Sequence, residues 1–170
     1  MLPFMDKQDW DRRVAEAWTQ LDHLPEEDFR ALIDRLAAEL PSDDGDASFE
    51  RAAAYDSTGH PGHAVPLYRE ALAKGTTGER RRRTVIQLAS SLRNLGHPEE
   101  SIALLTPELT APSDHLDDAI RAFLALALAD TGQEREALTL SLTALAPHLP
   151  RYQRSLTNYA HLLTHSTPPA

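Results

Sequence analysis

Histidines are the only credible source of metal or acid–base chemistry in this sequence, which contains eight of them. His161 and His165 are four positions apart, so on a helix their rings would lie one turn apart and could share a metal ion. The HExxH pattern of zinc hydrolases is missing around them, and His60 with His63 falls in a predicted turn. The favoured interpretation is that neither pair binds a metal, and we expect no metal site.

Motifs for catalysis or cofactor binding are also missing from the sequence. There is no glycine-rich phosphate loop, dinucleotide-binding fingerprint, nucleophile elbow or zinc signature. Because there is no cysteine, disulfides, thiolate metal ligands and cysteine nucleophiles are excluded. We therefore expect a protein without catalytic residues or cofactors, which acts by noncovalent binding.

The charge of the chain limits its partners. The formal net charge is −9, which disfavours binding to nucleic acid or to anionic membranes. Residues 1–44 carry twelve acidic and five basic side chains and so account for −7 of this charge. No apolar run approaches the roughly 20 residues that cross a bilayer, and no secretory signal is recognisable, so we expect a cytoplasmic protein.

The one basic run, residues 80–83, opens a predicted helix with a polar face. The favoured interpretation is that these arginines form a solvated helix start. Because cations at a helix N-terminus are electrostatically unfavourable, nearby acids, such as those of residues 1–44, would neutralise them; binding of an anionic ligand is the functional alternative. From the last arginine onward, polar residues recur every three or four positions, which places them on one side of the helix. These residues are Arg83, Gln87, Ser90 and Asn94.

The elements that must position these side chains are indicated by three glycines. Gly59, Gly96 and Gly132 are 37 and 36 residues apart, and small residues recur seven positions before and five positions after each of them. Small side chains let two helices approach closely, and glycine permits a positive-φ turn between them. The pattern predicts three antiparallel helix pairs. The small residues are Ala52, Ala89 and Ala125 before the turns, and Ala64, Ser101 and Ala137 after them.

Further helices are predicted on both sides of these pairs. Apolar residues recur at helical spacing in residues 10–21 and again in residues 29–40, which predicts a helical pair at the N-terminus. Residues 152–163 form a last amphipathic stripe, which predicts a helix that caps the array. We expect residues 166–170 to be frayed.

The register of these residues resembles the tetratricopeptide repeat, a helix-turn-helix unit with a period near 34 residues. The resemblance covers residues 45–149 and implies an all-α fold of about nine helices, stacked as a right-handed superhelix. It implies one continuous domain with an acidic helical pair at 1–44, helix pairs at 45–78, 82–113 and 118–149, and a capping helix at 150–165. The chain departs from the family where an early tryptophan and a late proline are replaced, at Ser48, Val85 and Arg121 and at Thr76, Ser113 and Leu149.

The resemblance also implies that the first helix of each pair lines a concave groove that binds a protein or peptide. The groove would change from acidic, through cationic and amide-bearing, to apolar, which suits a peptide with a basic part and an apolar anchor. The competing interpretation is that this face is only the hydrated side of amphipathic helices. The candidate residues are Asp46, Glu50, Ser57, Arg83, Gln87, Ser90, Asn94, Phe123, Leu126 and Asp130.

These observations favour a non-catalytic adaptor or scaffold. The alternative is a regulator that binds a small peptide or an anionic metabolite near Arg83 and Asn94, and that acts as a homodimer. Residues 119–130 are apolar almost all round, so we expect the C-terminal helix to cover them. If it does not, Phe123 and Leu126 would form a dimer interface or a ligand surface.

Overall fold

The computed structural model describes residues 6–165, and the predicted frayed end at residues 166–170 lies outside them. In the described residues the regular structure consists of nine α-helices and two short 3-10 helices, without a β-strand. This confirms the predicted all-α fold with about nine helices. The chain divides into two compact units, Met1–Thr84 and Val85–Ala170, and the boundary falls inside α5 (Gly78–Asn94). The prediction of one continuous domain stays a prediction.

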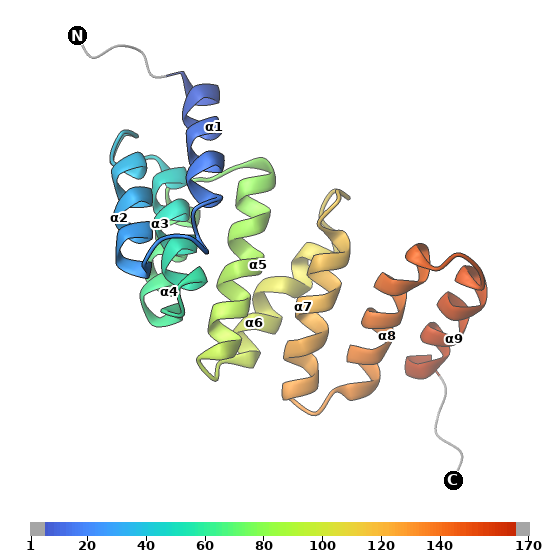
Figure 1. Ribbon diagram of the computed structural model, residues 1–170. Coiled ribbons are helices and arrows are strands. Elements are labelled where there is room, and N and C mark those ends of the chain that lie inside the picture. Colours follow the sequence, from blue (N-terminus) through green and yellow to red (C-terminus); the bar gives the residue numbers. More distant parts are fainter. Residues whose placement is uncertain (1–5, 166–170) are drawn as a thin grey trace. The chain divides into compact units, whose positions relative to one another are not determined.

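The first unit contains two consecutive helix pairs (Figure 1). Helix α1 (Lys7–Trp18) packs on α2 (Glu26–Ala37), and α3 (Gly45–Ser57) packs on α4 (Pro61–Ala73), while α2 also contacts α3. Two aspartates start helices here by side-chain capping: Asp6 accepts a hydrogen bond from the amide of Gln8 at 3.0 Å, and Asp44 accepts one from the amide of Asp46 at 2.8 Å.

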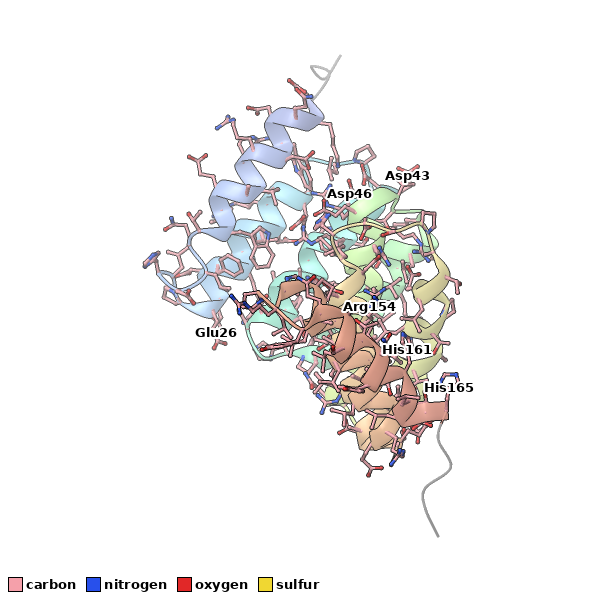
Figure 2. The ribbon with its side chains drawn as sticks, turned by 90° about the vertical axis from the view of Figure 1, so that its right-hand side faces the viewer. Glu26, Asp43, Asp46, Arg154, His161 and His165 are labelled. Carbon is pink, nitrogen blue, oxygen red and sulfur yellow. The ribbon has the colours of Figure 1, made fainter. Side chains whose placement is uncertain are left out.

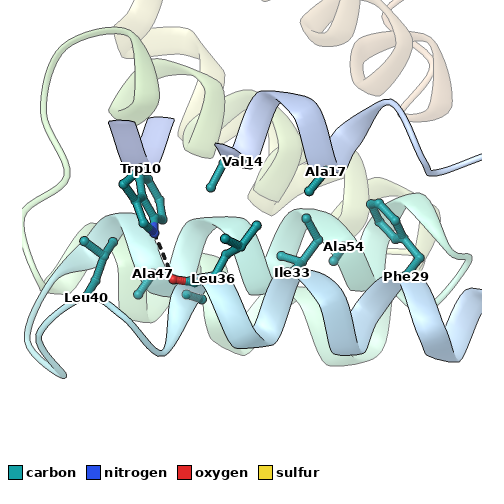
Figure 3. Close-up of a cluster of buried hydrophobic side chains, with 10 residues drawn as sticks. Trp10, Val14, Ala17, Phe29, Ile33, Leu36, Leu40, Ala47 and Ala54 are labelled. Atoms are coloured by element: carbon teal, nitrogen blue, oxygen red, sulfur yellow. Dashed lines mark hydrogen bonds between the residues drawn. The ribbon is translucent and has the colours of Figure 1, made fainter. Parts of the chain in front are cut away.

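The core of this unit is formed by one apolar face from each of α1, α2 and α3 (Figure 3). Trp10 is fully buried, and its indole Nε1 donates a hydrogen bond to the carbonyl oxygen of Leu36 at 2.8 Å, so burial leaves its polar atom satisfied. Trp18 and Phe29 close the far end with an edge-on contact of 5.1 Å between ring centroids. The predicted N-terminal helical pair is therefore held by interlocking side chains of both its helices.

The second unit continues with helices joined by short connections. Helix α6 packs against α7, α7 against α8, and α8 against α9. The bounds are α6 (Pro98–Leu105), η1 (Thr106–Thr110), α7 (Asp117–Asp130), α8 (Glu134–Leu145), η2 (Ala146–His148) and α9 (Gln153–His165).

The same turn connects the two helices of each of the three repeats. Gly59, Gly96 and Gly132 have φ angles of 79°, 85° and 77°, as the sequence predicts. In each turn the amide of the residue after the glycine donates to a carbonyl five positions earlier, for example His60 to Tyr55 at 2.9 Å. The six small residues predicted to separate the paired helices are all buried, which explains why their size recurs.

The expectation that the C-terminal helix covers α7 is wrong. Helix α9 packs against α8 and η2, and the side chain of Leu126 on α7 is 46% exposed. The contact with α8 includes two hydrogen bonds, since the Thr139 hydroxyl donates to the Ala160 carbonyl at 3.0 Å and the Arg135 guanidinium to the Leu163 carbonyl at 2.8 Å. Helix α7 is therefore left partly uncovered at Leu126.

Candidate functional site

Two of the predicted groove residues, Glu50 and Arg83, meet at a pocket of about 500 Å³ in the first unit, where α1, α3 and the start of α5 converge. We call this cavity the Glu50 pocket. Its wall on α1 is mostly apolar, and its wall on α3 and α5 is charged. The residues that line it are Asp11, Val14, Ala15, Trp18, Glu50, Glu79, Arg80 and Arg83.

Glu50 is a buried carboxylate at the base of this pocket, with only 2% of its surface exposed. The Trp18 indole Nε1 donates to one of its oxygens at 2.8 Å, and Arg80 Nη2 donates to the other at 3.2 Å. Burial raises the pKa of Glu50 above its ordinary range, because it disfavours the charged form more than Trp18, Arg80 and Arg83 favour it. Glu50 is therefore a structural acid whose hydrogen-bonding capacity is largely used within the protein.

Arg80 neutralises the acidic side of the pocket. Its guanidinium forms ion pairs with Asp11 and Asp46, both at 3.0 Å, in addition to its contact with Glu50. Lys7 Nζ lies 2.7 Å from the same Asp46 carboxylate. Of its three acidic partners, Asp11 lies within residues 1–44, whereas Asp46 and Glu50 belong to α3. The predicted acidic end of the groove therefore consists of carboxylates that already have cationic partners.

Arg83 differs from its neighbour Arg80. Its guanidinium lies over the ring of Phe49, 5.1 Å from the centroid, and it forms no hydrogen bond or ion pair with any described residue. It is half-buried and lines the Glu50 pocket. Arg83 interacts with the Glu50 carboxylate through charge alone, without a hydrogen bond. Such a guanidinium, in the lining of a partly apolar cavity, can bind a carboxylate or a phosphate in a bidentate manner.

The remaining predicted residues are distributed as follows. Ser57 is exposed at the end of α3, away from the pocket lining, and Ala53, which the helical spacing places on the same face, is buried. In the second unit, Gln87 and Ser90 are half-buried on α5, and Asn94 is exposed. Asp130 on α7 is engaged by Arg93, whose Nε lies 2.5 Å from its carboxylate.

Phe123 and Leu126 belong to a different surface of the second unit. Leu126 lines a shallow groove of about 490 Å³ between α7 and α8, with small residues at its base and Leu138, 47% exposed, on the opposite side. Phe123 is half-buried and close to Leu126 in the sequence, but it does not line this groove. The lining residues are Ala122, Ala125, Leu126, Ala129, Glu134, Ala137, Leu138, Ser141 and Ala144.

Sequence reasoning missed Trp18 and Asp11 as parts of the site. Both belong to α1, which lies outside the repeat register, and their contacts to Glu50 and Arg80 span 32 and 69 residues. The helical stripe of residues 10–21 predicted that Trp18 is on an apolar face, but no local signal indicates that its N–H meets a carboxylate.

The histidines on α9 lie one turn apart (Figure 2). The His165 ring nitrogen Nδ1 is 2.7 Å from the backbone carbonyl of His161 rather than directed at a shared ion. Within residues 6–165 no group of three or more histidine, aspartate or glutamate side chains is arranged to hold a metal ion. None of the helices in the same residues combines the length and apolar character needed to span a membrane.

Comparison with known proteins identifies one family. The family model described as tetratrico peptide repeat matches residues 45–163 of the chain. No curated protein and no solved structure shows significant similarity. The match begins where the predicted repeats begin and extends into the last helix, so that α9 is included in the matched region.

Proposed function

Because the chain belongs to the tetratricopeptide repeat family, whose repeats generally mediate protein–protein interaction, we propose that it is an adaptor or scaffold that binds a protein or peptide partner at the Glu50 pocket. Proteins of this family are typically non-enzymatic scaffolds. The partner inserts a short segment against the face formed by the first helices of the pairs, without nucleic acid or membrane and without a cofactor.

The observation that carries this proposal is the guanidinium of Arg83, which forms no hydrogen bond or close ion pair with a described residue. It lies beside an apolar wall supplied by Val14 and Ala15, so the pocket offers one positive charge and one apolar surface. The partner segment that fits carries an acidic group next to an apolar side chain. A basic group in the partner is disfavoured here, since the carboxylates of Asp46 and Glu50 are paired with Arg80.

The test is affinity capture with three forms of the full chain as bait. The parent protein retains a partner, an Arg83→Glu variant loses it because the new carboxylate repels the acidic group, and an Arg12→Glu variant keeps it. Arg12 is the matched control, because it is exposed on α1 and pairs with Asp9 outside the pocket. Circular dichroism checks that all three have the same helix content. Equal retention by all three baits would show that the pocket is not the partner site.

A ligand-responsive regulator is the second candidate, and it is supported by the same Arg83 guanidinium. A small acidic peptide or an anionic metabolite at Arg83 would stabilise the native state by mass action, by about 2.7 kcal/mol at a concentration 100 times its dissociation constant. A rise in melting temperature with small anions that is lost in Arg83→Glu favours this candidate over a protein partner.

Self-association is a separate part of the proposal. The exposed Leu126 and Leu138 belong to a groove that is otherwise lined mainly by alanines. The same surface therefore supplies both the leucine side chains and the groove that could receive them. Such a surface is self-complementary in a two-fold dimer. We propose a homodimer through this face of α7 and α8.

A further inference from the structure

A second groove, of about 630 Å³, lies between α2, α3 and α4 of the first unit, and none of its lining residues belongs to the Glu50 pocket. We call it the Tyr55 groove. Four of its lining residues are apolar, namely Ala31, Ala54, Pro66 and Leu67. The other lining residues are Glu27, Arg30, Asp34, Arg51, Tyr55, Gly62 and His63.

Proline inside α4 gives this groove an unpaired backbone acceptor. Pro66 lies in the middle of α4 and has no N–H, so it cannot donate the helical hydrogen bond to the carbonyl of Gly62, four residues earlier. Both residues line the groove, and Gly62 has only backbone atoms to present there. The groove wall therefore offers a carbonyl oxygen that a ligand donor can use.

The cationic side chains of the groove are already engaged. Arg51 Nε donates to Asp34 at 2.6 Å, and Arg30 Nη1 donates to the Thr58 hydroxyl at 2.9 Å while its guanidinium lies over Tyr55. The Tyr55 ring is also stacked on His63, with 5.2 Å between centroids. These contacts engage both guanidinium groups and part of the aromatic surface in the lining.

The acidic residues are engaged unequally. Glu26, which begins α2 (Figure 2), lies 3.6 Å from His60 and 3.7 Å from Arg30, whereas its neighbour Glu27 forms no hydrogen bond or ion pair with a described residue. Glu27 lines the groove and Glu26 does not. The groove thus presents two groups that only accept, the Glu27 carboxylate and the Gly62 carbonyl, beside the Tyr55 hydroxyl and the His63 ring, which can donate or accept.

We propose that the Tyr55 groove binds a lysine side chain from a segment of a partner protein. The ammonium group has three donors, which suit the Glu27 carboxylate and the Gly62 carbonyl together. Its methylene stem lies on the apolar lining residues of the groove. The net charge of −9 for the chain attracts a cationic segment over a longer range.

The experiment titrates the full chain with a short capped peptide that carries one lysine between two leucines, followed through backbone amide NMR signals. The signals near Glu27 and Gly62 shift and saturate. A peptide with norleucine in place of lysine binds about tenfold more weakly, the loss expected when one charge-assisted hydrogen bond is removed. Equal affinity of the two peptides would mean that the groove binds the apolar part of the side chain and does not recognise the ammonium group, and the proposal would be overturned.

Variants locate the contact. Glu27→Gln weakens binding of the lysine peptide about tenfold, whereas Glu26→Gln, the matched control outside the lining, leaves it unchanged. Pro66→Ala also weakens binding, because the new N–H pairs with the Gly62 carbonyl, and it keeps the fold because alanine is the better helix former. Unchanged affinity in both Glu27→Gln and Pro66→Ala would overturn the assignment of the ammonium to this groove.

Two controls test where the lysine peptide binds and what the groove selects. Arg83→Glu leaves the affinity for the lysine peptide unchanged, so failure here and failure of the Glu50 pocket can be told apart. Free n-hexylammonium serves as a small-amine probe. If it saturates the site and the lysine peptide does not bind, the groove is a small-amine site and the proposal of a protein segment is wrong.

Discussion

At the scale of single residues, the Glu50 pocket is organised by a carboxylate that is costly to ionise. Glu50 is held between an indole N–H and a guanidinium, yet burial still raises its pKa. The hydrogen bonds from Trp18 and Arg80 recover only part of the hydration free energy that the Glu50 carboxylate loses on burial. The donors are positioned by this carboxylate, so its main role is to orient Trp18 and Arg80 around the pocket.

The pH dependence of stability tests this view of Glu50. With its pKa raised above the ordinary 4.5, the folded state holds the proton more tightly than the unfolded state. The stabilisation is fully present below 4.5 and is lost as pH rises through the higher native pKa. A Glu50→Gln variant lacks this loss, so its stability relative to the parent rises between acidic and neutral pH. Urea unfolding across that range measures the difference.

Glu39→Gln is the control of opposite sign. Arg13 lowers the pKa of Glu39 by hydrogen bonding, so the contribution of Glu39 is present above 4.5 and is lost as pH falls through the lower native pKa. A constant difference between the parent and Glu50→Gln at every pH would contradict a raised pKa for Glu50.

The sequence predicted which face of a helix these residues occupy but not their partners. Periodicity along α3 and α5 placed Glu50 and Arg83 on one side of their helices. It could not indicate that Arg80, 30 residues from Glu50, neutralises the acidic end of the predicted groove. Such pairings depend on the angle at which helices cross, and residue spacing within one helix contains no information about that angle.

At the scale of helices, the repeated turns were predictable because they are local. Each turn needs a glycine with positive φ and a hydrogen bond from the following amide to a carbonyl five residues earlier. All of these groups lie within one short stretch of chain, so the three turns could be predicted from sequence alone. The placement of α9 is not local. The amphipathic stripe predicted the helix itself, but not the hydrogen bonds from Thr139 and Arg135 to backbone carbonyls of α9, which have no signature in the sequence.

The close approach of α3 to the end of α4 allows a prediction about Gly45. A β-carbon at this position would lie 2.7 Å from the Ala71 carbonyl oxygen and 2.8 Å from Thr76 Cγ2. Gly45→Ala should therefore lower the free energy of unfolding by about 1–3 kcal/mol, as expected for overpacking. Gly62→Ala is the control, since a β-carbon there has no neighbour within 4 Å.

The Gly62→Ala control should leave the free energy of unfolding unchanged or raise it by about 0.5 kcal/mol, because alanine restricts the unfolded chain and favours the helix. Urea unfolding of both variants under the same conditions measures the two effects. A Gly45→Ala protein as stable as the parent would show that the end of α4 can move away from α3.

At the scale of the whole molecule, the all-α class and the family were predictable, since they depend on recurring residue size over 45–163 rather than on particular contacts. The surfaces that remain open for partners were harder to predict. The sequence predicted that residues 119–130 are buried, because they are apolar almost all round, yet the side chain of Leu126 is about half exposed. Uniform apolarity indicates that a helix is covered in the functional state, but not whether its own chain supplies the cover.

The oligomeric state tests whether a second copy supplies the cover. We expect the parent protein to sediment with the mass of two chains at high concentration, because Leu126 of one copy fits the alanine-lined groove of the other. The double variant Leu126→Glu, Leu138→Glu should sediment as one chain, since four carboxylates would meet in the interface. Leu162→Glu on α9, where the leucine is 54% exposed, is the matched control and should stay dimeric. A parent protein with the mass of one chain at the highest concentration reached would exclude the homodimer and leave this face of α7 and α8 for a different protein.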